Sequence, residues 1–196
     1  MITVKSALGA FRFVTLVLIT GPALRAGAAI DFTPITGERV LEGVVFKQLI
    51  FHENGRAITY EQPRGWTYSG DTNHIRFNLP DIGQAQAEMV QSPLLGPQTF
   101  NDATAKLLQN QVLASIPPGS QNATVISEEQ NPVSINRQQT YAVIIGYSLS
   151  GQEYRLSVIF LNLPNTQVQF RVIARKQDFE EVNRLFRASL FSLQWH

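Results

Sequence analysis

The residues with the most obvious chemical potential in this sequence are its three histidines. His52, His74 and His196 are not spaced four apart and form no His-x-His pair, so they do not follow the spacing of zinc sites. Asp71 lies three residues before His74, and we interpret this pair as part of a turn at the start of a strand. The sequence therefore predicts no metal site and no cofactor.

The stretch from Gly146 to Gly151, GYSLSG, is similar to the nucleophile elbow Gly-x-Ser-x-Gly of hydrolases. The elbow's second glycine is missing, because Ser150 stands two positions after Ser148. The elbow also needs a turn from a strand into a helix, whereas the pattern around Ser148 predicts a strand that enters a hairpin. We expect no catalytic serine here and no catalytic residues elsewhere.

Two aromatic side chains suggest a stacking surface for a ligand. Trp66 follows the turn Pro63-Arg64-Gly65, and Tyr68 comes two residues later, so both rings point to one face of a strand. The alternative is that they anchor the hydrophobic core. We favour the core, because isolated aromatic residues beside a strand start mostly pack.

Three arginines of the last predicted hairpin could form a surface for an anion or an acidic partner. With a turn centred near Pro164, Arg155 lies opposite Ile173, which places Arg171 and Arg175 diagonal to it on the same face. The alternative is that these guanidinium groups pair with acidic side chains of the chain itself.

The elements that must position these residues are mostly strands. Residues 44–52 and 56–62 alternate in polarity on either side of Asn54-Gly55, a strong hairpin signal. Short extended pieces follow at 66–70 and 74–80, and another at 84–91. The segment from Ile30 to about Arg39 has little pattern, so we expect it to be a lead-in.

A helix is predicted after residue 99, with Thr99 as its N-cap and Asp102 three residues on. Pro117-Pro118-Gly119 ends it. Its apolar residues recur at helical spacing, namely Ala105, Leu108, Val112 and Ile116.

Three further runs, 141–149, 154–160 and 168–172, alternate with period two and predict an antiparallel meander with one buried face. Residues 177–195 then predict a helix capped by Asp178 that closes the core over the meander. Its apolar stripe consists of Phe179, Val182, Phe186 and Leu190. The expected fold is α+β, an antiparallel sheet of about six strands flanked by helices.

The N-terminal 28 residues have the three parts of a secretory signal, with cleavage expected after Ala28 or Ala29. They carry Lys5, Arg12 and Arg25, so their removal leaves 13 basic against 15 acidic side chains, a net charge of −2. A near-neutral chain is not typical of nucleic-acid binders. The apolar run of the signal is too short for a permanent membrane helix, and no later segment reaches spanning length, so we expect no stable membrane insertion. The chain has no cysteine, so packing without disulfides must hold it together.

The order of these features resembles the PsbP/DcrB-like superfamily. The resemblance rests on Tyr60…Pro63-x-Gly65-Trp66, the middle helix, the three long strands and the final DFEEVNRLFRASLFSL helix, and covers roughly residues 58–195. It implies an antiparallel sheet sandwiched by helices, and members that are not enzymes as a rule but bind other proteins or help to retain ions. We therefore divide the chain into a signal (1–28), a lead-in with the first strands (29–57) and a PsbP-like domain (58–196).

The sequence predicts an exported, non-enzymatic binding or accessory protein of the cell envelope, periplasmic or secreted. Its partner would be an envelope protein or a small ligand. The alternative is a periplasmic hydrolase with a site built from loops.

Overall fold

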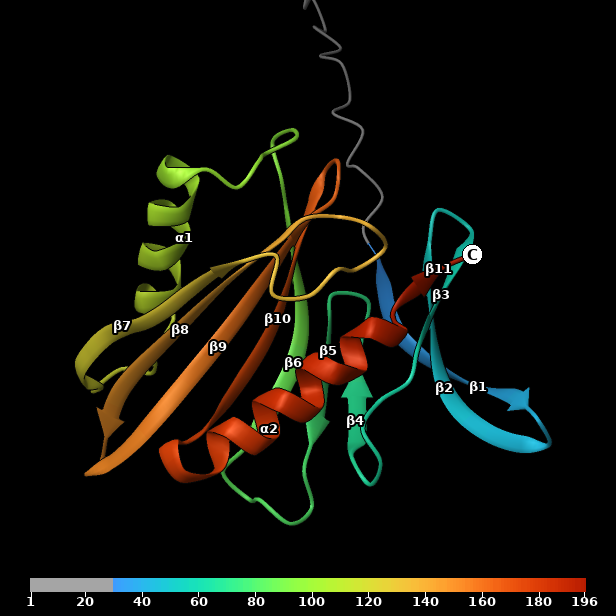
Figure 1. Cartoon of the computed structure of the whole chain (residues 1–196), viewed down its shortest axis with the longest axis horizontal. Coiled ribbons are helices and arrows are strands. Elements are labelled where there is room, and N and C mark those ends of the chain that lie inside the picture. The colour runs from blue at the N-terminus through green and yellow to red at the C-terminus, as the bar shows by residue number, and fades with distance from the viewer. Residues whose placement is uncertain (1–29) are drawn as a thin grey trace, which may run out of the picture.

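The computed structural model describes residues 30–196, which form two antiparallel β-sheets and two α-helices (Figure 1). One sheet has the order β1-β2-β3-β11 and the other the order β4-β5-β6-β10-β9-β8-β7. The α+β class is confirmed, but the strands number 11 in these residues, more than the six predicted.

The predicted signal and its cleavage site lie outside the described residues. From residue 30 onward, the helices are too short or too polar to cross a bilayer. The elements are β1 (Asp31–Leu41), β2 (Val44–Glu53), β3 (Arg56–Tyr60), β4 (Thr67–Gly70), β5 (His74–Asn78), β6 (Gln86–Pro93), α1 (Asp102–Ala114), β7 (Gln121–Gln130), β8 (Thr140–Leu149), β9 (Gln152–Asn162), β10 (Thr166–Arg175), α2 (Lys176–Ser189), the 3₁₀ turn η1 (Leu190–Ser192) and β11 (Gln194–Trp195).

The first predicted hairpin is confirmed. Asn54 and Gly55 both have positive φ, 52° and 77°, as a two-residue turn matched to the strand twist requires. The lead-in prediction before it is wrong, because residues 31–41 form β1, which pairs with β2. Only Phe32 of β1 is fully buried, so the strand shows no regular alternation in the sequence.

Helix α1 begins two residues later than predicted. Its N-cap is Asn101, whose side chain accepts from the Thr104 N–H at 3.0 Å, and Thr104 Oγ1 accepts from the Asn101 N–H at 2.8 Å. The Thr99 cap prediction is therefore wrong. The side chain of Asn101 satisfies a backbone donor that would otherwise lack a partner in the first turn.

Strand β7 was missed by the sequence analysis. Every residue of it is exposed, so no buried face left an alternating signal. It is an edge strand, and its pairing with β8 is irregular between Gln121 and Thr124 and between Val125 and Ser127. Such bulges discourage further strand pairing at an open edge.

The meander β8-β9-β10 is confirmed, but both of its faces are covered. Tyr141, Val143 and Ile145 of β8 pair with Phe160, Val158 and Leu156 of β9 and pack under α1 with Leu108 and Val112. The apolar stripe of β10, Val168, Phe170 and Val172, points to the opposite face, where α2 packs. The expectation that α2 seals all three stripes is therefore wrong.

Helix α2 buries the predicted stripe, and Phe179, Val182 and Phe186 are fully enclosed. It begins at Lys176 with Arg175 as N-cap and no side-chain cap, so Asp178 lies in the first turn instead of capping it. The helix ends at Ser189 rather than continuing to residue 195. After η1, Trp195 pairs with Ile58, so the last residues join the four-stranded sheet.

The four-stranded sheet lies on the α2 side and shares one hydrophobic core with the larger sheet. Phe32 and Phe51 of the small sheet belong to the same buried cluster as Phe77, Phe170 and Phe186. The predicted boundary after residue 57 thus falls inside β3, which pairs with β2, and residues 30–57 are part of the same packed unit.

Candidate functional site

Each helix covers only half of one face of the seven-stranded sheet. Helix α1 contacts β7 and β8, and α2 contacts β10 and β9 on the other side (Figure 1). On the α1 side, β10, β6 and β5 therefore extend beyond the helix. The apolar residues of these strands, such as Val172, Ala87 and Phe77, point into the core on the α2 side. The residues that alternate with them, on the α1 side, are mostly polar.

A hollow of about 220 Å³ lies at this place, between the end of α1 and the open strands. We call it the Arg171 pocket. Arg171 pairs with Glu88 across β10 and β6, and Glu88 pairs with Arg76 across β6 and β5, so three charged residues stand in one row of the sheet. The full lining is Arg76, Gln86, Glu88, Ser115, Pro117, Leu156, Arg171 and Ile173.

Arg171 has unused hydrogen-bonding capacity. Its Nη1 lies 3.2 Å from Glu88 Oε1, and its Nη2 donates to Ser115 Oγ at 3.2 Å. Its Nε is buried and has no partner. A guanidinium offers five N–H donors, so most of those of Arg171 remain free. Its side chain is only 23% exposed, which strengthens any hydrogen bond that it makes to an anion.

Glu88 is held by two neighbours, because Gln86 Nε2 donates to its Oε2 at 3.2 Å while Oε1 faces Arg171. Arg76 has no carboxylate within ion-pairing distance among residues 30–196. Two guanidinium groups and one carboxylate give the lining a net charge of +1. The floor is apolar, formed by Leu156 and Ile173, which are opposite each other on β9 and β10.

The same face continues beyond the pocket as a line of amides and tyrosines. Gln84 Oε1 accepts from Arg175 Nε and from Tyr154 Oη, both at 2.6 Å. The Tyr154 ring stacks on Tyr147 with centroids 5.7 Å apart. Burial, and secondarily the neighbouring Tyr154, raises the pKa of Tyr147 to about 12, and its hydroxyl has no partner.

The three arginines predicted to form one surface do not do so. Arg155 lies opposite Ala174 instead of Ile173, so the register is shifted by one residue. Arg155 consequently points to the α2 face, where it pairs with Glu180 and lies 5.8 Å from the ring of Phe179. Arg171 and Arg175 remain on the α1 face.

Trp66 is an anchor of the core, as favoured from the sequence. It is 7% exposed and stacks on Phe186 with centroids 6.2 Å apart and an interplanar angle of 14°. Tyr68 is partly buried against the same cluster, and its hydroxyl lies 2.8 Å from Thr36 Oγ1.

The other residues singled out in the sequence stay apart from the Arg171 pocket. His74 Nδ1 lies 3.0 Å from Asp71 Oδ2, within a turn whose backbone N–H groups also donate to Asp71. Ser148 pairs with Glu153 just before the Ser150-Gly151 turn, so it lies on a strand that enters a hairpin. Neither residue lines the pocket.

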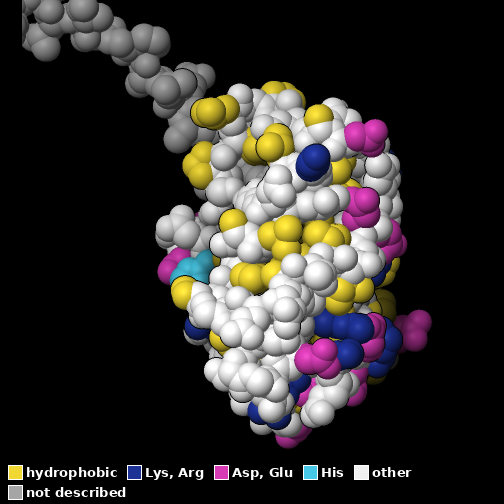
Figure 2. Space-filling model, turned by 90° about the vertical axis from the view of Figure 1, so that its left-hand side faces the viewer, with side chains coloured by type: hydrophobic (Ala, Val, Ile, Leu, Met, Phe, Trp, Pro, Cys, Tyr) yellow, Lys and Arg dark blue, Asp and Glu magenta, His cyan; other side chains and the backbone are white. Residues whose placement is uncertain are grey.

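The side of the molecule that carries β7 is shown in Figure 2. Basic and acidic side chains stand beside each other at its lower end, and hydrophobic side chains occupy its middle and upper parts. Arg155–Glu180 and Lys176–Glu153 are ion pairs of this mixed kind.

Comparison with known proteins adds a likeness of fold. The match is to solved structures alone. A protein of unknown function from Pseudomonas aeruginosa has 13% identity and a TM-score of 0.48, over 79% of this chain and 93% of that one. The PsbP of Synechocystis sp. PCC 6803 has 14% identity and a TM-score of 0.47, over 90% of this chain and 96% of that one. The predicted resemblance to PsbP-like proteins is thus found, as a loose match of fold.

No family model matches the sequence, and no curated protein matches it.

Sequence reasoning missed Arg76, Glu88 and Ser115. The alternation of HIRFN and QAEMVQ does show that Arg76 and Glu88 leave the core face of their strands. What it does not show is that β6 pairs with β10, a partner some 80 residues later in the chain. That pairing brings Glu88 to Arg171.

Proposed function

We propose that this protein is an exported, non-enzymatic binding protein of the cell envelope, and that the Arg171 pocket holds a small anionic ligand. The observation that carries the proposal is the state of Arg171, a largely buried arginine with unused donors in a hollow of net positive charge. A carboxylate or similar oxyanion supplies the acceptors that these N–H groups lack.

The remaining lining matches a ligand with a short apolar part. Leu156 and Ile173 offer contact to carbon atoms, and Gln86 can bond to a polar substituent. The hollow is below the roughly 300 Å³ at which drug-sized sites begin, so the ligand is small.

Binding without catalysis is favoured by the lack of an activated nucleophile in the lining. Ser115 supplies the hydroxyl there, and its Oγ donates to Val112 O at 2.8 Å instead of to a base. Nucleophilic catalysis needs a base within hydrogen-bond reach. The alternative, a hydrolase with a site built from loops, would need such a pair elsewhere.

The test is a titration with small carboxylates, inorganic phosphate and sulfate, followed by thermal unfolding and calorimetry. We expect at least one anion to raise the Tm of the parent, and Arg171→Met to weaken its binding at least tenfold. Arg184→Met removes the same charge from the exposed surface of α2, on the other side of the sheet, and should bind as the parent does.

Because Arg171→Met leaves Glu88 without its partner, the variant Arg171→Met/Glu88→Gln provides a fold control. It should unfold cooperatively and still fail to bind. If no anion raises the Tm, or if both Arg171 variants bind like the parent, the pocket is not the ligand site.

Export is supported by the signal pattern of residues 1–28. N-terminal sequencing of the protein from the envelope of its host should begin at Ala29 or Ile30. Recovery of a chain that still begins at Met1 would contradict export by cleavage.

A further inference from the structure

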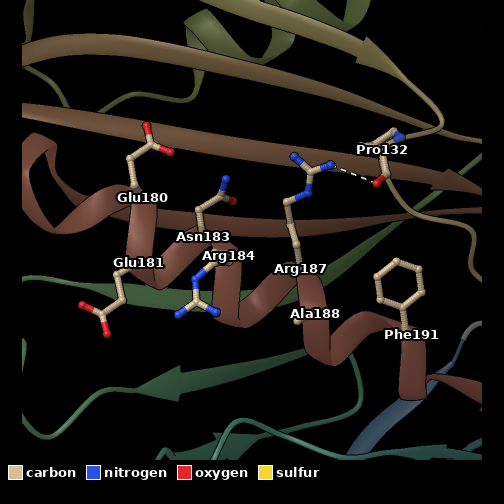
Figure 3. Close-up of a pocket in the computed structure, with 8 residues that line it drawn as sticks. All are labelled: Pro132, Glu180, Glu181, Asn183, Arg184, Arg187, Ala188 and Phe191. Atoms are coloured by element: carbon tan, nitrogen blue, oxygen red, sulfur yellow. Dashed lines mark hydrogen bonds between the residues drawn. The ribbon is translucent and has the colours of Figure 1, made fainter.

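A second hollow, of about 570 Å³, runs along the exposed side of α2 (Figure 3). We call it the α2 groove. It is formed by α2, the η1 turn and the loop that follows β7, and its lining is Pro132, Glu180, Glu181, Asn183, Arg184, Arg187, Ala188 and Phe191. It lies on the opposite side of the sheet from the Arg171 pocket.

Asn183 is out of place for a residue that only packs. It borders the groove but is only 6% exposed, and the other buried residues of α2 are Phe179, Val182 and Phe186. Its Oδ1 has no hydrogen-bond partner. Buried amides are nearly always hydrogen-bonded, and an aliphatic residue would fill this position in a helix better.

Figure 3 shows the Asn183 amide between the side chains of Glu180 and Arg187, on the same side of α2. The terminal torsion of asparagine is broad and roughly two-fold, so a half-turn exchanges the amide oxygen and nitrogen and directs either one to the groove. A primary amide whose oxygen has no partner complements a peptide unit, since it can accept from the N–H and donate to the C=O.

One end and the rim of the groove offer further contacts to a ligand. Phe191 is 62% exposed and lies beside Pro132, which gives one end an apolar contact surface. Arg187 is fixed there, because it donates to Pro132 O at 2.9 Å and pairs with Glu129 at 3.2 Å. Arg184 lines the rim with no ion pair among residues 30–196.

From these contacts we propose that the α2 groove binds an extended segment of a partner polypeptide. Its main chain bonds to the Asn183 amide, an apolar side chain packs on Phe191, and an acidic side chain faces Arg184. A long, open hollow beside a helix suits a peptide, whose backbone supplies donors and acceptors along its length.

The experiment uses random heptapeptides displayed on phage, selected on the immobilised protein. Synthetic copies of the selected peptides are then titrated by fluorescence polarisation. We expect enrichment of sequences with an apolar and an acidic residue. Asn183→Leu and Phe191→Ser should each weaken binding at least tenfold, whereas Gln177→Ala, on an exposed part of α2 outside the groove, should leave it unchanged.

Thermal unfolding separates loss of contact from loss of fold. Asn183→Leu removes an unpaired buried amide, so its Tm should equal or exceed that of the parent. The proposal is overturned if no peptide is enriched over a blank surface, or if selected peptides bind Asn183→Leu and Phe191→Ser as tightly as the parent. Arg171→Met should bind the peptides normally, so failure of this proposal is distinct from failure of the first one.

Discussion

Trp66 shows how much one side chain contributes when it joins two parts of the core. Its ring stacks on Phe186 of α2, and Phe186 in turn contacts Phe77 of β5. Replacing it by Ala leaves a cavity between the helix and the sheet. We expect Trp66→Ala to lower the free energy of unfolding by about 3–5 kcal/mol, measured by urea denaturation. Tyr68→Ala, which removes a partly buried ring nearby, should cost less. Equal stability of Trp66→Ala and the parent would contradict the anchor role.

Tyr147 is the residue from which we expect a pH effect. Its pKa is raised to about 12 from the ordinary value of about 10, chiefly by burial. The unfolded chain therefore loses this proton first, so the contribution of Tyr147 to stability is complete below about pH 10 and declines as the pH rises toward 12. The buried hydroxyls of Tyr60 and Tyr141, whose pKa values are also raised, add to the same alkaline loss.

The variant Tyr147→Phe tests this expectation by urea unfolding at pH 7, 10 and 11. Because the hydroxyl has no partner, the variant should be at least as stable as the parent at pH 7. It should also lose less stability between pH 10 and 11. Tyr60→Phe gives the contrast, because that hydroxyl lies 2.6 Å from Ser189 Oγ and its removal should destabilise at pH 7. A Tyr147→Phe variant that is less stable at pH 7 would reveal a partner for the hydroxyl.

Among the elements, helix α1 offers the simplest prediction. Asn101 and Thr104 bond to each other's backbone N–H, whereas the side chain of Thr99, the residue expected to cap, is exposed. Asn101→Ala should lower stability by about 1 kcal/mol, and Thr99→Ala should have little effect. Guanidinium denaturation of both variants is the measurement. A larger loss of stability for Thr99→Ala than for Asn101→Ala would show that Thr99 is the N-cap.

The hairpin β9-β10 shows how correctly predicted strands can still give a wrong prediction of the residues that share a face. The strands were predicted correctly, but the turn has two central residues, Pro164 and Asn165, closed by the Leu163 N–H that donates to Thr166 O at 2.8 Å. A turn centred on Pro164 alone shifts the register by one, and a shift of one residue moves every side chain to the other face. That shift placed Arg155 beside Arg171 in the prediction, although the sheet separates them.

For elements with little buried surface, the sequence offers few signals. β8, β9 and β10 were found because apolar side chains alternate along them. β1 and β7 were missed because their side chains are mostly exposed. Among the candidate site residues, Arg171 could be named in advance, but Glu88 and Ser115 join it only through contacts between segments distant in the chain.

At the scale of the whole molecule, the two sheets should unfold together. Trp66 reports on the large sheet, and Trp195 on the small one, where its Nε1 donates to Glu53 Oε2 at 3.1 Å. Both sheets contribute to one buried cluster. Trp66→Phe and Trp195→Phe each leave one fluorescent tryptophan. In each variant, the unfolding transition followed by fluorescence should coincide with the transition followed by far-ultraviolet circular dichroism. Earlier melting of the Trp195 reporter, in Trp66→Phe, would show that the small sheet opens separately.

Helix α1 covers one half of one face of the large sheet, and α2 covers a different half of the opposite face. This staggered coverage has a consequence for assembly. A small anion in the Arg171 pocket and a peptide along α2 would be divided by the thickness of the sheet, so neither would block the other sterically. A ternary complex would then form in either order, and any influence of one guest on the affinity of the other would be equal in both directions. β9 reaches both sites, because Leu156 lines the Arg171 pocket and the neighbouring Arg155 pairs with Glu180 in the α2 groove.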